Sequence, residues 1–152
     1  MAQQTPIRFL SRYAPLVIWL LLISFASTDE FSANNTSRFI GPLVLWLFPH
    51  ISEGRLELIH FLTRKLAHFS EYAILAILAA RAFRTSRNTL LSRHWFLISL
   101  ALIIIYALLD EYHQSFVPSR TASVFDSFID MSGGIAALAV MSWRRTFERS
   151  AN

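Results

Sequence analysis

The sequence predicts an all-α fold, a polytopic membrane helical bundle of about four transmembrane helices with one further interfacial or re-entrant segment. Hydrophobic residues make up 54% of the 152 residues and charged residues only 16%, a balance that is unusual for a soluble domain of this size. Four apolar stretches also approach the roughly 17–25 residues that a helix needs to cross a bilayer. We therefore expect one integral membrane domain over residues 1–152.

Polar connections separate the four predicted spans, which cover residues 13–27, 66–83, 95–112 and 124–143. The first span is slightly short unless Arg12 extends its side chain to the membrane surface. The same region has the basic start and small-residue end of a cleavable secretory signal. Cleavage is the alternative interpretation, and it would leave three spans with unchanged orientation.

Residues 39–65, between the first two spans, are predicted to form an interfacial and amphipathic region. Its apolar part, 39–48, is too short to cross a bilayer and is interrupted by prolines. After Ser52, a residue type favoured at helix N-caps, apolar residues recur every three or four positions. That spacing predicts an amphipathic helix running into the second span.

Basic residues gather on one side of the predicted spans. They precede the first span, surround the connection near residues 81–93 and follow the fourth: Arg8, Arg12, Arg81, Arg84, Arg87, Arg93, Arg144, Arg145 and Arg149. The positive-inside rule therefore predicts that both termini are cytoplasmic and that the polar motifs face outward. We expect an integral protein of the inner (cytoplasmic) membrane. The net charge of +4 indicates contact with lipid head groups and no nucleic acid partner.

The first polar motif lies at the start of the second span. Lys65, His68 and Tyr72 are three and four residues apart, so they share one helical face, with Glu71 beside them. A cation, an imidazole and a phenol suit binding of an anionic head group or proton relay. The alternative is structural: Lys65 reaches the interface, His68 pairs with a carboxylate, and Tyr72 belongs to an aromatic belt.

The second polar motif ends the third span. Asp110 and Gln114 share a helical face, and Glu111 lies on the adjoining one. Both acids oppose the negative end of the helix dipole, so they need a cationic partner. Lys65 and Arg120 are the candidates.

Two further acids open the fourth span. Asp126 either belongs to the site or closes a capping box with Ser123. Asp130 lies one turn deeper on the same face, and Gly133 and Gly134 continue that face without side chains. The glycines predict close helix packing or close approach of a ligand.

Together these motifs define the candidate site. The candidate acid or base groups are His68, Asp110, Glu111 and Asp126, and the candidate ligand-binding groups are Lys65, Tyr72, Gln114, Arg120 and Asp130. The carboxylates of Asp110, Glu111, Asp126 and Asp130 offer oxygen ligands, so a divalent cation such as Mg²⁺ is an alternative to a site with no cofactor. The chain has no cysteine, which excludes disulfides and thiolate metal sites.

The combination K-x-x-H-F-x-x-Y, then D-E-x-x-Q-x-F-x-P-x-R, then an Asp and a glycine-containing last span resembles the VanZ-like family of small bacterial membrane proteins. An apolar first span ending in Ser-Phe-Ala-Ser is also similar. The characteristic positions fall on Lys65, His68, Phe69, Tyr72, Asp110, Glu111, Gln114, Pro118, Arg120, Asp126 and Gly133. Two positions depart from the pattern: Arg64 replaces an acid, and Asp130 replaces an Asn.

The resemblance implies a cell-envelope membrane protein, in a family named for a protein that raises resistance to teicoplanin. Our leading hypothesis is a site that binds, and in an enzyme version modifies, an anionic lipid or a lipid-linked wall precursor. One alternative is a proton-coupled transporter or flippase component, which with four spans would require a homo-oligomer. Another is a structural scaffold in which the charges only lock the helices together.

Overall fold

The computed structural model describes residues 6–28, 33–117 and 124–150, with side chains for 9–28, 38, 40–117 and 125–147. These residues form α-helices and no strand. The helices are α1 (Pro6–Ala26), α2 (Ala33–Leu47), α3 (Glu53–Arg84), α4 (Thr89–Arg93), α5 (Trp95–Gln114) and α6 (Val124–Ser150). The predicted all-α class is confirmed.

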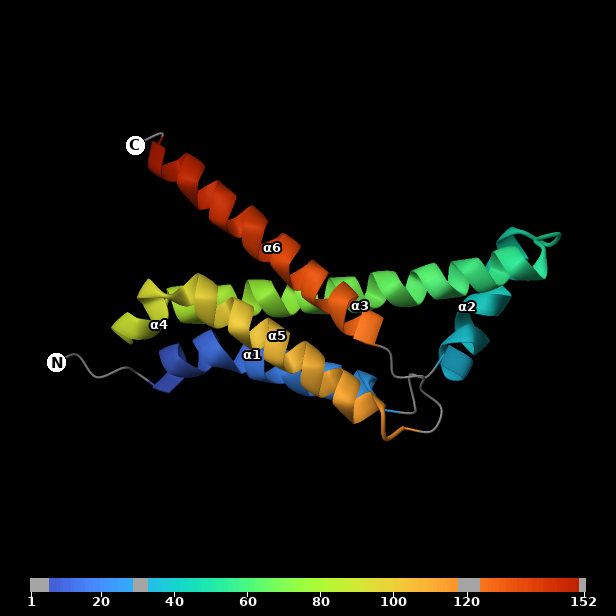
Figure 1. Cartoon of the computed structure of the whole chain (residues 1–152), viewed down its shortest axis with the longest axis horizontal. Coiled ribbons are helices and arrows are strands. Elements are labelled where there is room, and N and C mark those ends of the chain that lie inside the picture. Colours follow the sequence, from blue (N-terminus) through green and yellow to red (C-terminus); the bar gives the residue numbers. More distant parts are fainter. Residues whose placement is uncertain (1–5, 29–32, 118–123, 151–152) are drawn as a thin grey trace.

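Four of these helices, α1, α3, α5 and α6, are long and apolar enough to cross a membrane. Helix α1 begins at Pro6 and has 21 residues. The first span is therefore longer than predicted from the apolar stretch 13–27, and the prediction of a slightly short span is wrong. In Figure 1, α1, α3 and α5 run along one another while α6 crosses obliquely. The start of α1, the end of α3, α4 and the start of α5 lie at one end of the bundle.

The opposite end, which we call the α2 end, carries α2, the start of α3, the end of α5 and the start of α6 (Figure 1). Helix α2 has 15 residues and includes Pro42; at about 1.5 Å per residue it is too short to cross. It packs against α3. This helix is the additional segment that the sequence predicts.

Helix α3 joins the predicted amphipathic helix and the second span without a break. Its 32 residues extend over about 48 Å, more than the roughly 30 Å of hydrocarbon in a bilayer. Its charged first turns, with Glu53, Arg55 and Glu57, are therefore the part that extends beyond the hydrocarbon. Ser52 occupies the N-cap position as predicted, although its side chain makes no capping hydrogen bond.

Helix α3 is the centre of the bundle and contacts α1, α5 and α6. Its fully buried face includes small residues such as Ala76 and Ala79, which let neighbouring backbones approach. A Cβ atom on Gly133 of α6 would lie 2.1 Å from the carbonyl oxygen of Phe69, and one on Gly134 would lie 2.7 Å from Ile103 Cγ2. The predicted close helix packing is thus observed at both glycines.

Two side-chain contacts fix the second half of α1. The hydroxyl of Tyr106 lies 2.6 Å from the carbonyl oxygen of Leu20, to which it donates, and Trp19 Nε1 donates to the carbonyl of Glu71 at 2.9 Å. These bonds hold α1 against both α5 and α3. They bring Ser27, the residue directly after α1, close to the C-terminal end of α5.

Candidate functional site

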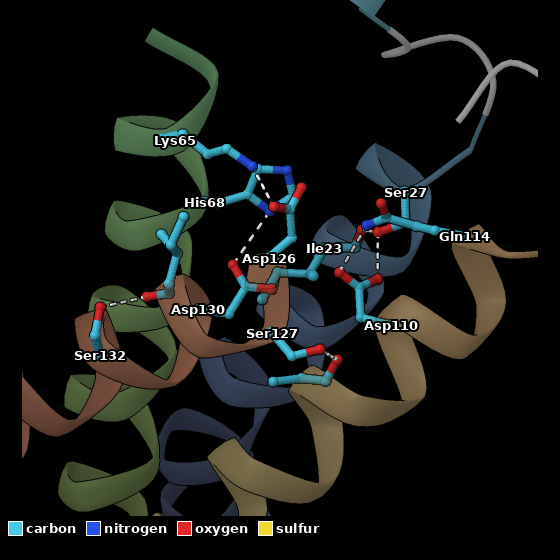
Figure 2. A network of polar contacts seen from close by, with 12 residues as sticks. Ile23, Ser27, Lys65, His68, Asp110, Gln114, Asp126, Ser127, Asp130 and Ser132 are labelled. Carbon is cyan, nitrogen blue, oxygen red and sulfur yellow. Dashed lines mark hydrogen bonds and ion pairs between the residues drawn. The ribbon is translucent and has the colours of Figure 1, made fainter. Parts of the chain in front are cut away.

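Polar side chains from four segments meet inside the α2 end of the bundle (Figure 2). The polar cluster consists of Ser27, Lys65, His68, Asp110, Gln114, Asp126 and Asp130. Ser27 follows α1, and the others lie on α3, α5 and α6. The two motifs that the sequence singles out, about 45 residues apart, therefore converge at one end of the bundle, as predicted.

Lys65 of α3 forms an ion pair with Asp126 in the first turn of α6. The two side chains are 16% and 13% exposed, so this pair forms the outer edge of the polar cluster. The sequence predicts Lys65 as a candidate ion-pair partner of Asp110 and Glu111. For Asp110 that prediction is wrong, because Lys65 pairs with Asp126. Asp126 is more than a helix cap, because its carboxylate binds a residue of another helix; Ser123, the other half of the predicted capping box, lies outside the described residues.

His68 and Asp130 form the inner part of the polar cluster. His68 Nδ1 lies 3.2 Å from Asp130 Oδ1, and the two residues are only 8% and 1% exposed. Although the two atoms are this close, neither has a hydrogen-bond partner among the described residues. The contact agrees with the structural interpretation of His68 as the partner of a carboxylate, and it leaves both atoms with unused bonding capacity.

Among the described residues, the hydrogen-bond partners of Asp110 are neutral donors. Ser27 Oγ donates to Asp110 Oδ1, and Gln114 Nε2 donates to Asp110 Oδ2 at 3.1 Å. Ser27 Oγ also lies 3.0 Å from the carbonyl oxygen of Ile23, but a hydroxyl has one hydrogen, and the carboxylate is the stronger acceptor. Asp110 faces α1 because Tyr106, one turn earlier, anchors α1 there. The sequence analysis assigned Ser27 no role in the site, although Ser27 ends the Ser-Phe-Ala-Ser segment that resembles the family, and that segment is the signal that could have identified it.

Tyr72 lies one turn beyond His68 and is fully buried. Its hydroxyl has no hydrogen-bond partner among the described residues. A lipid-facing place in an aromatic belt, the structural alternative for this residue, is therefore wrong. Lys65, His68 and Tyr72 do share one face of α3, and that face points into the bundle.

Besides Tyr72, two further predicted site residues are not among the residues that define the polar cluster. Glu111 is half-buried and lies on the face of α5 adjoining that of Asp110. Arg120 lies outside the described residues, as does Pro118. The described cations of the polar cluster are thus Lys65 and, when protonated, His68.

One subset of the polar cluster has the composition of a metal centre. Ligand atoms of His68, Asp110 and Asp130 all lie within 4.8 Å of one another, and all three residues are buried. The sequence-based metal alternative used Asp110, Glu111, Asp126 and Asp130. In the structure the group contains His68 and not Glu111, and Asp126 forms an ion pair with Lys65.

The described surface also has hollows near the α2 end. A pocket of about 680 Å³ is lined by the end of α2 and the start of α3, including His50 and Arg55. A groove of about 280 Å³ is lined by α1 residues from Trp19 to Ala26 together with Glu71. Of these two hollows, the groove is the one that adjoins the polar cluster, because Ser27 directly follows Ala26, the last α1 residue of its lining.

A family model described as VanZ/LLP1 matches residues 11–145 of the chain. The matched region includes every residue of the polar cluster and nearly all of the four spanning helices. No curated protein and no solved structure gives a significant match.

Proposed function

The chain belongs to the VanZ/LLP1 family of membrane proteins, and we propose that its polar cluster binds the phosphate-bearing head group of a membrane lipid. The class includes anionic phospholipids and lipid-linked cell-wall precursors, which share a phosphate ester next to hydrocarbon chains. The observation that carries the proposal is the Lys65–Asp126 pair, a partly exposed charge pair at the edge of a buried polar site.

Lys65 is the anion-binding group in this proposal. Its ammonium already makes a charge-assisted contact with a carboxylate, and a lipid phosphate offers the same kind of oxygen acceptor. Because the pair is partly exposed, a phosphate can compete with Asp126 for Lys65 without opening the helix core. His68 and then Tyr72 lie successively deeper along the same face of α3, where they can donate hydrogen bonds to a head group.

The groove on α1 supplies a place for the hydrocarbon part of the ligand. Its lining is mostly apolar, with Trp19, Leu22 and Phe25 among its residues, and it ends beside the polar cluster. A ligand with a charged head and an apolar chain fits this sequence of surfaces. A soluble phosphate compound would leave the groove unfilled.

The arginines support the proposed orientation. Arg81, Arg84, Arg93 and Arg145 lie at the bundle end opposite the polar cluster. Under the positive-inside rule that end is cytoplasmic, so the polar cluster faces outward in an inner (cytoplasmic) membrane. A site there is positioned for lipids of the outer leaflet, and a role in resistance to teicoplanin would act through such a lipid.

Native mass spectrometry tests the proposal on protein extracted gently from its own membrane. The variant Lys65→Gln/Asp126→Asn removes both charges of the pair while keeping two polar side chains of similar size. Arg84→Gln, an exposed cation at the other end of α3, is the matched control. We expect a discrete phosphate-bearing lipid on the wild type and the control that is lost from the double variant; identical lipid adducts on all three proteins would contradict the proposal.

A further inference from the structure

His68, Asp110 and Asp130 lie at the inner end of the polar cluster, on three different helices. Their ligand atoms fall within 4.8 Å of one another. Two ligand atoms of one tetrahedral Zn²⁺ ion, with bonds of about 2.0–2.2 Å, lie about 3.3–3.6 Å apart. To share an ion, the side chains therefore need to bring their ligand atoms closer by about 1 Å or slightly more.

The bonding state of these groups also indicates a missing partner. His68 Nδ1 and Asp130 Oδ1 face each other at 3.2 Å, and neither has a hydrogen-bond partner among the described residues. Asp130 is 1% exposed, and a buried polar atom without a partner carries a free-energy cost of about 1–3 kcal/mol. An ion bound to both atoms would remove that cost.

The hydrogen bonds to Asp110 resemble those that orient metal-binding carboxylates. Its two carboxylate oxygens each accept one hydrogen bond, from Ser27 and from Gln114. Each oxygen keeps a further lone pair, because a carboxylate oxygen can accept two. Outer hydrogen bonds of this kind orient ligating carboxylates in known metal sites.

Charge gives a third, independent reason. Within the part of the chain that the structure describes, the polar cluster holds three carboxylates (Asp110, Asp126 and Asp130) and one permanent cation, Lys65. With His68 neutral, these described groups carry a net negative charge. A net charge of this kind is costly in a membrane interior, and a divalent cation cancels it.

We propose that His68, Asp110 and Asp130 hold a divalent cation of the Zn²⁺ or Mn²⁺ type. The imidazole nitrogen disfavours Mg²⁺ and Ca²⁺, which prefer oxygen ligands alone. Three protein ligands leave at least one position open, as in metal sites that bind an exchangeable group. The suggestion that a lipid phosphate takes this position rests on the proposed function; the metal site itself does not.

Metal content and thermal unfolding of the full chain in detergent test this inference. The protein is stripped with a chelator, given Zn²⁺, Mn²⁺ or Mg²⁺ singly, desalted, and analysed for bound metal. The variants are Asp130→Asn, Asp110→Asn and His68→Gln, with Glu57→Gln, an exposed acid on α3, as the control. We expect one Zn²⁺ or Mn²⁺ per chain in the wild type and the control, and affinity lower by on the order of tenfold or more in each ligand variant.

Unfolding without metal separates this role from a merely structural one. Asp130→Asn removes a buried negative charge, so its metal-free melting temperature is expected to equal or exceed that of the wild type while its metal-induced rise is lost. Absence of metal from the wild type at micromolar concentrations, or an unchanged metal-induced rise in Asp130→Asn, would overturn the inference. Metal without lipid would sustain it and contradict the proposed function, and lipid without metal would do the reverse.

Discussion

His68 Nδ1 lies 3.2 Å from Asp130 Oδ1, and this distance is set by the packing of α6 on α3. One turn beyond Asp130, the backbone of Gly133 meets the carbonyl of Phe69, the residue directly after His68. The glycine contact fixes the register of the two helices, and the register fixes the imidazole beside the carboxylate. The geometry of the polar cluster thus depends on a position that has no side chain.

Gly133→Ala is expected to disrupt this register. The added Cβ would lie 2.1 Å from a backbone oxygen, which cannot move without moving α3, so we expect destabilisation of about 1–3 kcal/mol or more. Thermal unfolding in detergent measures the effect. Gly54→Ala is the control, because its Cβ would meet nothing within 4 Å, and alanine is the better helix former by about 1 kcal/mol. Gly134→Ala should fall between them, since it meets a side chain; equal melting temperatures for all three would show that α6 does not pack as described.

Ser27→Ala is expected to destabilise the protein by about 1.5–3 kcal/mol, the usual range for losing a hydrogen bond to a charged group. Of the two described donors to Asp110, the variant leaves Gln114. Ser24→Ala removes a hydroxyl one turn earlier on α1, where Tyr106 keeps its bond to Leu20, and should cost less. Chemical unfolding of both variants gives the comparison, and a larger loss in Ser24→Ala would count against the Ser27–Asp110 bond.

Exchanging the charges of the outer pair separates binding from architecture. Lys65→Glu alone places two acids together and should lower the melting temperature, whereas Lys65→Glu/Asp126→Lys restores an ion pair between α3 and α6. We expect the exchanged pair to recover most of the stability without recovering lipid binding, because the cation has moved to the other helix. Recovery of both properties would favour the scaffold alternative.

The orientation of the protein in the membrane can be measured by labelling single introduced cysteines, because the chain has no cysteine of its own. Phe116 at the α2 end and Leu90 in α4 are 66% and 63% exposed. We expect a membrane-impermeant maleimide to label Phe116→Cys in intact cells, and Leu90→Cys only after the membrane is opened. The reverse labelling pattern would place the polar cluster on the cytoplasmic side.

The sequence predicts much of this architecture for a physical reason. A helix must satisfy its backbone hydrogen bonds in a bilayer, so apolar length alone identifies the spanning helices, and helical spacing puts Lys65, His68 and Tyr72 on one face. The choice of partners between helices is different. Lys65 pairs with Asp126 and not with Asp110 because of how α6 rests on α3, and no spacing within one helix contains that information.

The same limit explains why Ser27 gained no role from the sequence. Its importance comes from the contact of α1 with α5, which Tyr106 fixes from 79 residues away in the chain. Tyr72 likewise has the composition of an interfacial residue but lies at the centre of the bundle. In each case a contact between helices, and not the local pattern, determines what the side chain does.

Photo-crosslinking from inside the membrane shows whether a phosphate-bearing lipid lies beside Lys65. Leu66 is 65% exposed and adjoins Lys65, while Leu97 is 62% exposed at the other end of the bundle. A photoreactive amino acid at each position, followed by mass spectrometry of the adducts, identifies the lipid that lies there. We expect a phosphate-bearing lipid enriched at position 66 and lost on adding Lys65→Gln/Asp126→Asn; the same lipid mixture at both positions, unaffected by that change, would contradict lipid binding at the polar cluster.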